Sequence, residues 1–477
     1  MSNWRWWICT LLFVATTVNY LDRQVLSLTY KEFIAPEFHW TDAHYGTITS
    51  LFSIFYAIAC LFAGKFVDWM GTKKGYLISI GVWSTGAVMH AACGIASTWF
   101  LDEIDSVEAL RAVEAGSELA VAISTVSVYL FLLCRGILAL GESGNFPAAI
   151  KTTAEYFPKK DRAFATSIFN AGASVGALAA PLLIPPLAKH YGWEMAFIII
   201  GALGYIWMFF WQFMYDKPEK SKHVNQAELE YIHQDDAEEA AAAAAKPVEE
   251  EKSIPFIQCF KYKQTWSFIV GKFLTDGVWW FFLFWAPAYF QDQFNAPASS
   301  PLGQGLIFTL YAIVTVISLF GGYLPKLFVE KKGMNPYNGR MLAMLIFAFF
   351  PLVALAAQPL GAYSPWWPAI LIGIAGAGHQ AWSANIFSTV GDMFPKSTIA
   401  SITGIGAMAG GIGSMIIQKV AGNLFTYAEG QGAAFHFMGF EGKPAGYFIM
   451  FCFCGLAYLI GWTIMKALVP KYKPVEI

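Results

Sequence analysis

Long apolar runs recur along the whole chain and restrict it to one environment. Twelve stretches follow one another, each with the length of about 20 mainly apolar residues that a helix needs to cross a bilayer. Only 13% of the 477 residues are charged, whereas about 25% are charged in an average soluble domain. This leaves too little polar surface to cover several water-facing domains. The sequence therefore predicts an all-α membrane protein with twelve transmembrane helices.

The connections between the expected membrane spans alternate in charge. The spans cover residues 6–33, 44–67, 76–98, 119–154, 162–187, 194–214, 265–291, 303–328, 341–360, 366–391, 399–424 and 445–468. Lysine and arginine gather in every second connection, as at Lys73 and Lys331. Because positive loops remain in the cytoplasm, both termini are expected there. We expect a multi-pass protein of the cell inner (plasma) membrane.

Two hydrophilic stretches interrupt the apolar runs. Residues 99–118 carry six carboxylates and one arginine, and they predict an external acidic insertion within an N-terminal half, residues 1–214. Residues 215–262 contain an acidic, alanine-rich tract, which is typical of a solvated cytoplasmic linker. The C-terminal half is then residues 263–477, so that six expected spans lie on each side of the linker.

The two halves share an internal repeat. A shift of 237 places aligns residues 141–176 with 378–413 and gives nine identities, where ordinary composition would give about two or three. The identities include the Phe-Pro-Lys turn at 157–159 and 394–396. Two parallel six-span halves related about the membrane normal are typical of one transporter architecture, whose substrate site lies between the halves near the midplane.

Charged side chains deep inside the apolar runs, away from their ends, are few, and each costs about 2.5–3.5 kcal/mol at the centre of a span. They are Asp22 and Arg23 in the first span, Arg135 and Glu142 in the fourth, and Lys272 and Asp276 in the seventh. A spacing of seven places Arg135 and Glu142 on one helical face. A spacing of four lets Lys272 pair with Asp276. The charges predict a polar cavity; buried ion pairs that only hold helices together are the alternative.

Uncharged polar and aromatic residues accompany these charges. They are Tyr20, Tyr56, Asn170, Trp279, Trp280, His379, Gln380, Trp382 and Asn385. The repeat places His379 at the position of Glu142, although a lone histidine in a membrane often only satisfies the hydrogen bond of a neighbour. We expect spans 1, 4, 7 and 10 to line the cavity, with Asn170 added from span 5.

The connection between the second and third spans resembles a known signature. Its sequence, GKFVDWMGTKK, is similar to the motif G-x-x-x-D-x-x-G-x-[KR]-[KR] of the major facilitator superfamily. The fixed positions of the motif are filled by Gly64, Asp68, Gly71, Lys73 and Lys74. The resemblance implies a cytoplasmic gate built on ion pairs. Trp69 stands where many members carry arginine, which weakens that network.

Two further motifs resemble the anion:cation symporter family, which includes sugar-acid transporters. They are Asn19-Tyr20-Leu21-Asp22-Arg23 and Arg135…Gly141-Glu142…Phe146-Pro147, and the resemblance covers essentially all twelve spans. The acidic members, Asp22 and Glu142, are implied to couple protons. The arginines of both motifs are implied to bind an anion, and Tyr20 and Tyr56 are implied to line the cavity.

Within that family, residues 272–280 and 378–385 look most like the hexuronate (glucuronate/galacturonate) transporters. The aldonate branch would place a glutamine near Ala173 and an asparagine near Ala407, and neither is present. The implied substrate-binding residues are Tyr20, Arg23, Tyr56, Arg135, Asn170, Lys272, Asp276, Trp279, His379, Gln380, Trp382 and Asn385.

The sequence thus predicts a secondary active transporter that brings a hexuronate into the cytoplasm with protons, by alternating access. Another organic anion (an aldonate or a small carboxylate), sodium coupling and a substrate-sensing membrane receptor remain alternatives. An enzyme is not expected, because HExxH and clustered His and Cys ligands are missing from the sequence. We expect no cofactor, no metal and no nucleic acid. The expected partners of this monomer are a small anionic substrate, protons and the lipid bilayer.

Overall fold

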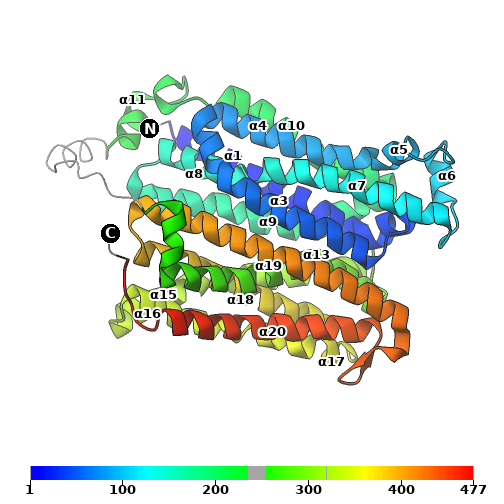
Figure 1. Ribbon diagram of the computed structural model, residues 1–477. Helices are drawn as coiled ribbons and strands as arrows, with labels where there is room; N and C mark the ends of the chain where they lie inside the picture. Colours follow the sequence, from blue (N-terminus) through cyan, green and yellow to red (C-terminus); the bar gives the residue numbers. More distant parts are fainter. Residues whose placement is uncertain (1, 235–253, 319, 476–477) are drawn as a thin grey trace. The chain divides into compact units, whose positions relative to one another are not determined.

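The computed structural model describes residues 2–234, 254–318 and 320–475, and these residues are mostly helical (Figure 1). From the amino end the helices are α1 (Trp4–Thr29), the π-helix η1 (Tyr30–Ile34), α2 (Ala35–Phe38), α3 (Asp42–Met70), α4 (Thr72–Met89), η2 (His90–Ala92), α5 (Cys93–Thr98), α6 (Val107–Arg111), α7 (Glu118–Glu142), α8 (Asn145–Tyr156), α9 (Lys159–Tyr191) and α10 (Trp193–Met214). The next elements are η3 (Pro218–Lys220), α11 (Gln226–Ile232) and η4 (Phe256–Lys261).

The rest of the chain is also helical apart from one short hairpin. Its helices are α13 (Lys263–Phe294), α14 (Pro301–Ser318), α15 (Phe320–Lys332), α16 (Pro336–Ala348), η5 (Pro351–Ala356), α17 (Ala357–Gly361), α18 (Trp366–Met393), α19 (Lys396–Gln431), η6 (Gly432–Ala434) and α20 (Lys443–Leu468). Strands β1 (His436–Phe437) and β2 (Phe440–Glu441) pair antiparallel, with His436 opposite Glu441.

Ten helical segments of the described residues are long and apolar enough to cross a membrane. Two further helices, α1 with 26 residues and α18 with 28, have the length but are not among these ten. Both contain polar groups that lower their hydropathy, such as Arg23 in α1 and His379 in α18. The predicted helical membrane fold is confirmed, whereas the number twelve stays a prediction.

The chain forms two compact units that do not follow the sequence order. The first unit is Met1–Val25, Ile58–Gly94 and Leu133–Lys252, and the second unit is Leu26–Ala57, Ile95–Leu132 and Ser253–Ile477. Helices α1, α3, α5 and α7 therefore contribute residues to both units. The halves 1–214 and 263–477, which lie on either side of the predicted linker, stay a prediction.

Glycines that the repeat aligns lie at close helix crossings. In the first unit, a side chain at Gly141 of α7 would meet the backbone nitrogen of Trp83 on α4 at 2.2 Å. In the second unit, a side chain at Gly378 of α18 would meet Cβ of Phe350, just after α16, at 2.6 Å. Each helix can approach its partner so closely only because glycine has no side chain.

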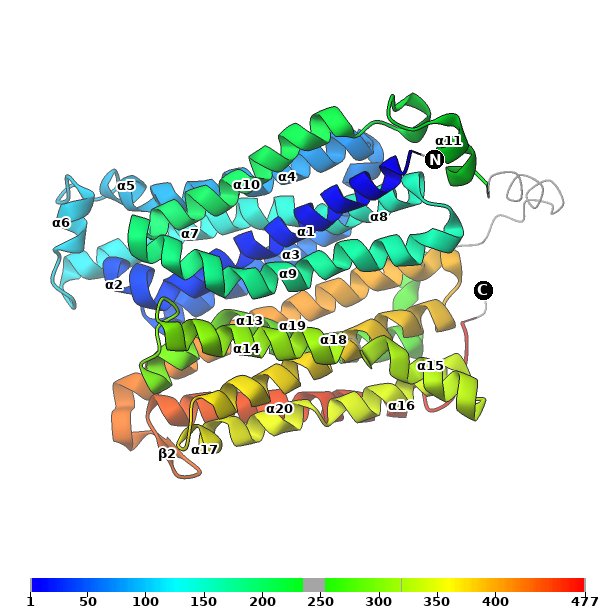
Figure 2. The same cartoon turned by 180° about the vertical axis from the view of Figure 1, so that it is seen from behind.

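A second aligned pair of glycines repeats this pattern. A side chain at Gly176 of α9 would meet the carbonyl oxygen of Thr17 on α1 at 2.6 Å, and α1 and α9 run next to each other in Figure 2. A side chain at Gly413 of α19 would meet the carbonyl oxygen of Phe273 on α13 at 2.0 Å. The repeat therefore corresponds to equivalent helix contacts within the two units.

Replacing Gly141 by alanine is expected to destabilise the protein by about 1–3 kcal/mol, because an added methyl group must push α7 away from the backbone of α4. Gly64 provides the matched control, since a side chain there would meet no described atom within 4 Å. Thermal unfolding in detergent measures both variants. An equal loss of stability for Gly64→Ala would contradict the explanation by close packing.

Part of the predicted linker is anchored in the first unit. The buried carboxylate of Glu228 on α11 accepts hydrogen bonds from the Ser2 hydroxyl, from the backbone N–H of Trp4 at 3.0 Å and from the guanidinium of Arg5 at 3.1 Å. Burial alone would raise the pKa of Glu228, but these hydrogen bonds and the charge of Arg5 outweigh burial and lower it. The acidic, alanine-rich tract, residues 235–251, lies outside the described residues.

Candidate functional site

Four buried charges of the first unit form a cluster between α1 and α7. Asp22, Arg23, Arg135 and Glu142 are each at most 4% exposed. Arg23 donates from Nε and Nη2 to the same oxygen, Oε2 of Glu142, at 2.9 and 2.7 Å. Arg135 donates from Nη2 to the carbonyl oxygen of Arg23 at 3.4 Å. The guanidinium of Arg23, a group that can bind an anion, is thus held by the carboxylate of Glu142.

The ion pair joins two helices rather than neighbours in sequence. Successive helical residues point about 100° apart, so Asp22 and Arg23 face different partners. The carboxylate of Asp22 is subject to the charges of Arg135 and Glu142, and it accepts no hydrogen bond from the described residues. Among the residues that the structure describes, Asp22 forms no ion pair within 4 Å. Asp22 and Glu142 therefore have different surroundings.

Tyr20 contacts this cluster of charges, whereas Asn170 forms no hydrogen bond with the cluster. Cζ of Arg23 lies 5.2 Å from the centre of the Tyr20 ring, within the range of a cation–π contact. Tyr20 also packs on α9, where a side chain at Gly176 would meet its Cβ at 2.9 Å. Asn170 is exposed on α9 and has no hydrogen bond within the described part of the chain.

A second charged pair lies in the second unit. Nζ of Lys272 is 2.7 Å from Oδ2 of Asp276, as their spacing of four along α13 allows, and Lys272 is only 4% exposed. The same ammonium group lies 4.2 Å from the ring centre of Phe387. Asp276 packs against α19, where a side chain at Gly410 would meet Oδ2 at 2.1 Å. The pair is therefore enclosed by α13, α18 and α19.

His379 lies between two aromatic partners. Its ring is parallel to that of Trp279, with 5.7 Å between the ring centres and an angle of 4° between the planes. Nδ1 of His379 is 2.8 Å from the hydroxyl of Tyr458, which donates to the carbonyl oxygen of Thr275 at 3.2 Å. Tyr458 was not predicted, because a single tyrosine in the apolar run of α20 carries no distinguishing pattern.

Two other predicted residues of α18 contribute to packing. Trp382 is fully buried, and its ring meets that of Tyr458 edge-on with 5.4 Å between centres. Asn385 donates to the carbonyl oxygens of Gly321 and Ala381 at 2.9 and 2.8 Å. The hydrogen bond to Gly321 fixes α15 against α18, whereas the bond to Ala381 lies within α18. The geometry of Asn385 therefore supports helix packing more directly than substrate binding.

Tyr56 and Gln380 are predicted site residues of the second unit that remain accessible. Both are partly exposed. The ring centre of Tyr56 lies 5.9 Å from that of Trp280 on α13, so the two rings form one aromatic surface. Within residues 2–234, 254–318 and 320–475, no three His, Cys, Asp or Glu side chains are grouped so as to hold a metal ion.

The signature residues surround the turn between α3 and α4 in the first unit. Gly71 has a φ of +78°, which favours glycine, and it directly precedes α4. Asp68 pairs with Lys151 of α8 at 2.7 Å. Trp69, at the position where many members carry arginine, is 80% exposed. A side chain at Gly64 would meet nothing within 4 Å among the described atoms.

The lysines of the signature lie at the surface. Nζ of Lys73 is 2.9 Å from Oδ1 of Asp216, beyond the end of α10, and the two side chains are 29% and 53% exposed. Lys74 is exposed. Ion pairs at a surface contribute about 0–1 kcal/mol, so they form and separate easily, as a gate requires.

Glu155 and Asp392, which the repeat aligns, contact equivalent loops. Glu155 accepts hydrogen bonds from Thr72 at 2.7 Å and from the hydroxyl of Tyr215. Asp392 accepts from Nε and Nη2 of Arg340 at 2.7 and 3.3 Å. Thr72 and Arg340 both follow the second expected span of their half. Each carboxylate thus ties the fourth expected span to the connection between the second and third.

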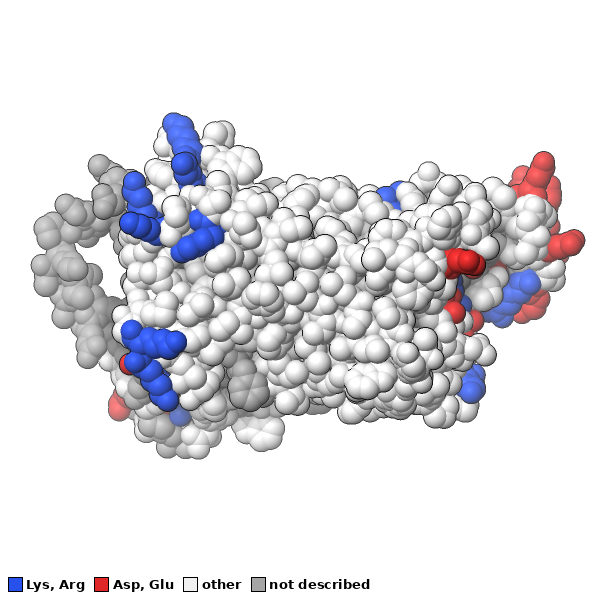
Figure 3. Space-filling model, turned by 90° about the horizontal axis from the view of Figure 1, so that it is seen from below, with Lys and Arg blue, Asp and Glu red and all other residues white. Residues whose placement is uncertain are grey.

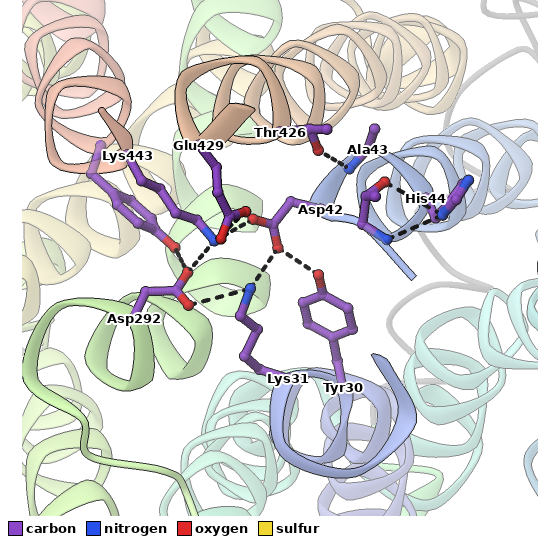
Figure 4. Close-up of polar contacts among 11 residues, drawn as sticks. Tyr30, Lys31, Asp42, Ala43, His44, Asp292, Thr426, Glu429 and Lys443 are labelled. Carbon is purple, nitrogen blue, oxygen red and sulfur yellow. Dashed lines mark hydrogen bonds and ion pairs between the residues drawn. The ribbon is translucent and has the colours of Figure 1, made fainter. Parts of the chain in front are cut away.

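A ring of four charges in the second unit was not predicted (Figure 4). Lys31 lies 3.1 Å from Asp42 and 3.2 Å from Asp292, and Lys443 lies 2.5 Å from Asp42 and 2.7 Å from Asp292. Each lysine therefore bridges both aspartates. The hydroxyl of Tyr30 also donates to Asp42, at 2.5 Å. We call Lys31, Asp42, Asp292 and Lys443 the four-charge ring.

The four-charge ring is largely buried although its members lie at helix ends. The exposed fractions of the side chains are 20% for Lys31, 0% for Asp42, 11% for Asp292 and 10% for Lys443. Each residue lies at or just beyond the end of an expected span, where charges are ordinary. The sequence carries no signal that these four side chains meet.

Comparisons with known proteins identify the family. The model described as Major Facilitator Superfamily matches residues 12–417. The chain is 27% identical to the hexuronate transporter of Escherichia coli (strain K12) over 88% of this chain and 87% of that protein, and 27% identical to the galacturonate transporter of Dickeya chrysanthemi over 72% and 88%. A bacterial homologue of the human lysosomal transporter Spinster has the same fold, with a TM-score of 0.69 at 16% identity over 99% of both chains. The predicted family is confirmed: this chain belongs to the Major Facilitator Superfamily.

Proposed function

We propose that this protein carries a hexuronate into the cytoplasm together with protons. The names of its relatives support a sugar-acid anion as the substrate. The main support for the proposal is the buried ion pair of Arg23 with Glu142. The guanidinium of this pair can bind an anion, and the carboxylate that holds the guanidinium can take up a proton.

Protonation of Glu142 is the proposed coupling step. A proton on the carboxyl group removes its negative charge and weakens both hydrogen bonds from Arg23. The released guanidinium can then bind the carboxylate of the substrate through two parallel hydrogen bonds. Asp22, which lacks an ion pair within the described residues, is the second proposed proton site.

One proton for each monovalent anion makes transport electroneutral. Moving a single charge against a membrane potential costs about 2.3 kcal/mol per 100 mV, and a co-transported proton removes that cost. The cluster around His379 offers an imidazole, a tyrosine hydroxyl and the face of Trp279, which suit the hydroxyls and the ring of a sugar. Lys272, which is paired with Asp276 on the same helix as Trp279, is the proposed cation for the anionic group of the substrate in the second unit.

The four-charge ring is the proposed outer gate. Asp42 begins α3 and Asp68 lies near its end, and the 29 residues of this helix span about 43 Å. The ring and the signature therefore lie at opposite ends of one helix. Because the ring joins Lys31 and Asp42 to Asp292 and Lys443 of the predicted C-terminal half, it must open when the halves separate on that side.

A competition panel in proteoliposomes tests the substrate. With an inward pH gradient, unlabelled glucuronate and galacturonate are expected to block uptake of a labelled hexuronate. Aldonates should compete about tenfold less well, which corresponds to the loss of one or two hydrogen bonds. Sodium should have no effect. Strong competition by an aldonate alone, or uptake that requires sodium, would contradict the proposal, and binding without accumulation would favour a sensor.

A further inference from the structure

We propose that a lysine-lined pocket of the second unit binds the headgroup of an anionic phospholipid. The cavity has a volume of about 660 Å³ and is bounded by residues 261–264, at the start of α13, and residues 468–475, after α20. Four lysines line it: Lys261, Lys263, Lys471 and Lys473. A lysine ammonium binds phosphate as a point charge. The pocket therefore offers several cationic donors to one phosphodiester.

The lysines of this pocket are not neutralised by the described part of the protein. All four are exposed. Within residues 2–234, 254–318 and 320–475, none of their ammonium groups lies within 4 Å of a carboxylate. A second cavity of about 650 Å³ shares residues 470–472 and adds Lys466. Lysines that gather without acidic partners attract an anion from outside the chain.

The walls of the pocket are held in place by hydrogen bonds. The side-chain amide of Gln264 donates to the carbonyl oxygen of Lys473 at 2.8 Å. The backbone N–H of Val475 donates to the carbonyl oxygen of Met393, at the end of α18, at 2.8 Å. The segment after α20 is thus fixed against α13 and α18. A pocket formed in advance loses less free energy on binding, because few groups must be ordered.

Exposed apolar side chains next to the pocket favour a lipid over a soluble anion. In η4, the side chains of Phe256 and Ile257 are 50% and 82% exposed, and Trp266 near the start of α13 is 47% exposed. The indole N–H of Trp266 donates to the carbonyl oxygen of Phe260 at 2.8 Å. Lysines beside exposed apolar and aromatic groups are typical of segments that lie in the membrane interface.

The position of the pocket along its helices places it at a membrane surface. It lies at the first residues of α13 and just beyond the last residues of α20, whereas Asp292 and Lys443 of the four-charge ring lie at the opposite ends of these helices. With the ring on the outer side, the pocket faces the cytoplasmic leaflet, where anionic lipids attract basic segments. Figure 3 shows lysine and arginine side chains gathered at one end of the face it presents, next to a wide band without charged side chains.

Binding of fluorescent phosphatidylglycerol to the purified full-length protein in detergent tests this site. The triple variant Lys261→Ala, Lys263→Ala and Lys473→Ala is compared with Lys217→Ala, Lys220→Ala and Lys222→Ala, which removes the same charge from exposed lysines of the first unit. The pocket variant is expected to bind roughly a hundredfold more weakly, and the control to bind like the wild type. Phosphatidylcholine should bind weakly to all three proteins.

Three results would overturn the proposal. Unchanged binding in the pocket variant would remove these lysines from any lipid site. An equal loss in both variants would indicate a diffuse charge effect. Competition by glycerol phosphate or inorganic phosphate as strong as that by the lipid would indicate a soluble anion instead. Thermal unfolding without added lipid checks that each variant is folded, and because no step measures transport, the outcome is independent of the proposed function.

Discussion

Replacing Glu142 by glutamine is expected to abolish proton-driven accumulation of the sugar acid while counterflow exchange continues. Glutamine has nearly the shape of a protonated glutamate and cannot release a proton. Arg23 then loses its ionised partner, to which it donates from Nε and Nη2 at 2.9 and 2.7 Å. The substrate can still bind and exchange, but its movement is no longer linked to a proton. The accumulation ratio under a pH gradient should fall to that of an equilibrating carrier.

Two controls separate coupling from binding and folding. Replacing Arg135 should abolish binding, and Arg23→Lys should weaken substrate binding by about tenfold or more, because lysine cannot form two parallel hydrogen bonds to a carboxylate. Removing one partner of a buried ion pair can cost about 3–5 kcal/mol, so thermal unfolding must accompany the transport assays. If folded Glu142→Gln still accumulates substrate against its gradient, Glu142 is not the coupling residue. Unchanged affinity after replacement of Arg135 would remove it from the site.

Replacing Lys443 by methionine is expected to open the four-charge ring. The change leaves the two buried carboxylates of Asp42 and Asp292 with a single cation of the ring, Lys31. Because an uncompensated buried charge costs about 3–5 kcal/mol, the closed arrangement should become much less favourable. A thiol introduced at Ser53, which is buried on α3 beside Ser414, should then react faster with a membrane-impermeant reagent added from outside.

A charge-balanced double variant is the matched control for this effect. Lys443→Met combined with Asp292→Asn leaves Lys31 paired with Asp42 at 3.1 Å and removes the excess carboxylate. Its stability loss should therefore be smaller than the sum of the two single losses, as expected for residues in direct contact. Additive losses, or unchanged thiol reactivity in Lys443→Met, would show that the ring does not close the outer side.

Features that depend on local pattern were predictable from the sequence. Apolar runs of the length of a membrane span predicted helices such as α3 and α20, because apolar length alone determines what a bilayer accepts. The connection predicted between the second and third spans contains the turn at Gly71, where φ is positive. The spacing of Lys272 and Asp276 on one helix was enough to predict their ion pair at 2.7 Å.

Features that depend on which helices are neighbours were not predictable. Arg23 pairs with Glu142, 119 residues away, because α1 crosses α7, and no spacing within either helix contains that information. The four-charge ring is the clearest case, since its members come from η1, α3, α13 and α20. Hydropathy alone also fails to identify α1 and α18 as membrane spans, because the polar groups of the proposed site lower the mean hydropathy of these two helices.

Proton movement driven by the substrate is the direct test of proton-coupled transport by this protein. Proteoliposomes with the wild-type protein and a trapped pH indicator are given external glucuronate without an imposed ion gradient. Acidification of the lumen is expected, with about one proton entering for each anion, because only that ratio makes the transport of a monovalent anion electroneutral. Glu142→Gln should give no acidification. Entry of glucuronate without a pH change, or entry that follows a sodium gradient, would contradict proton-coupled symport.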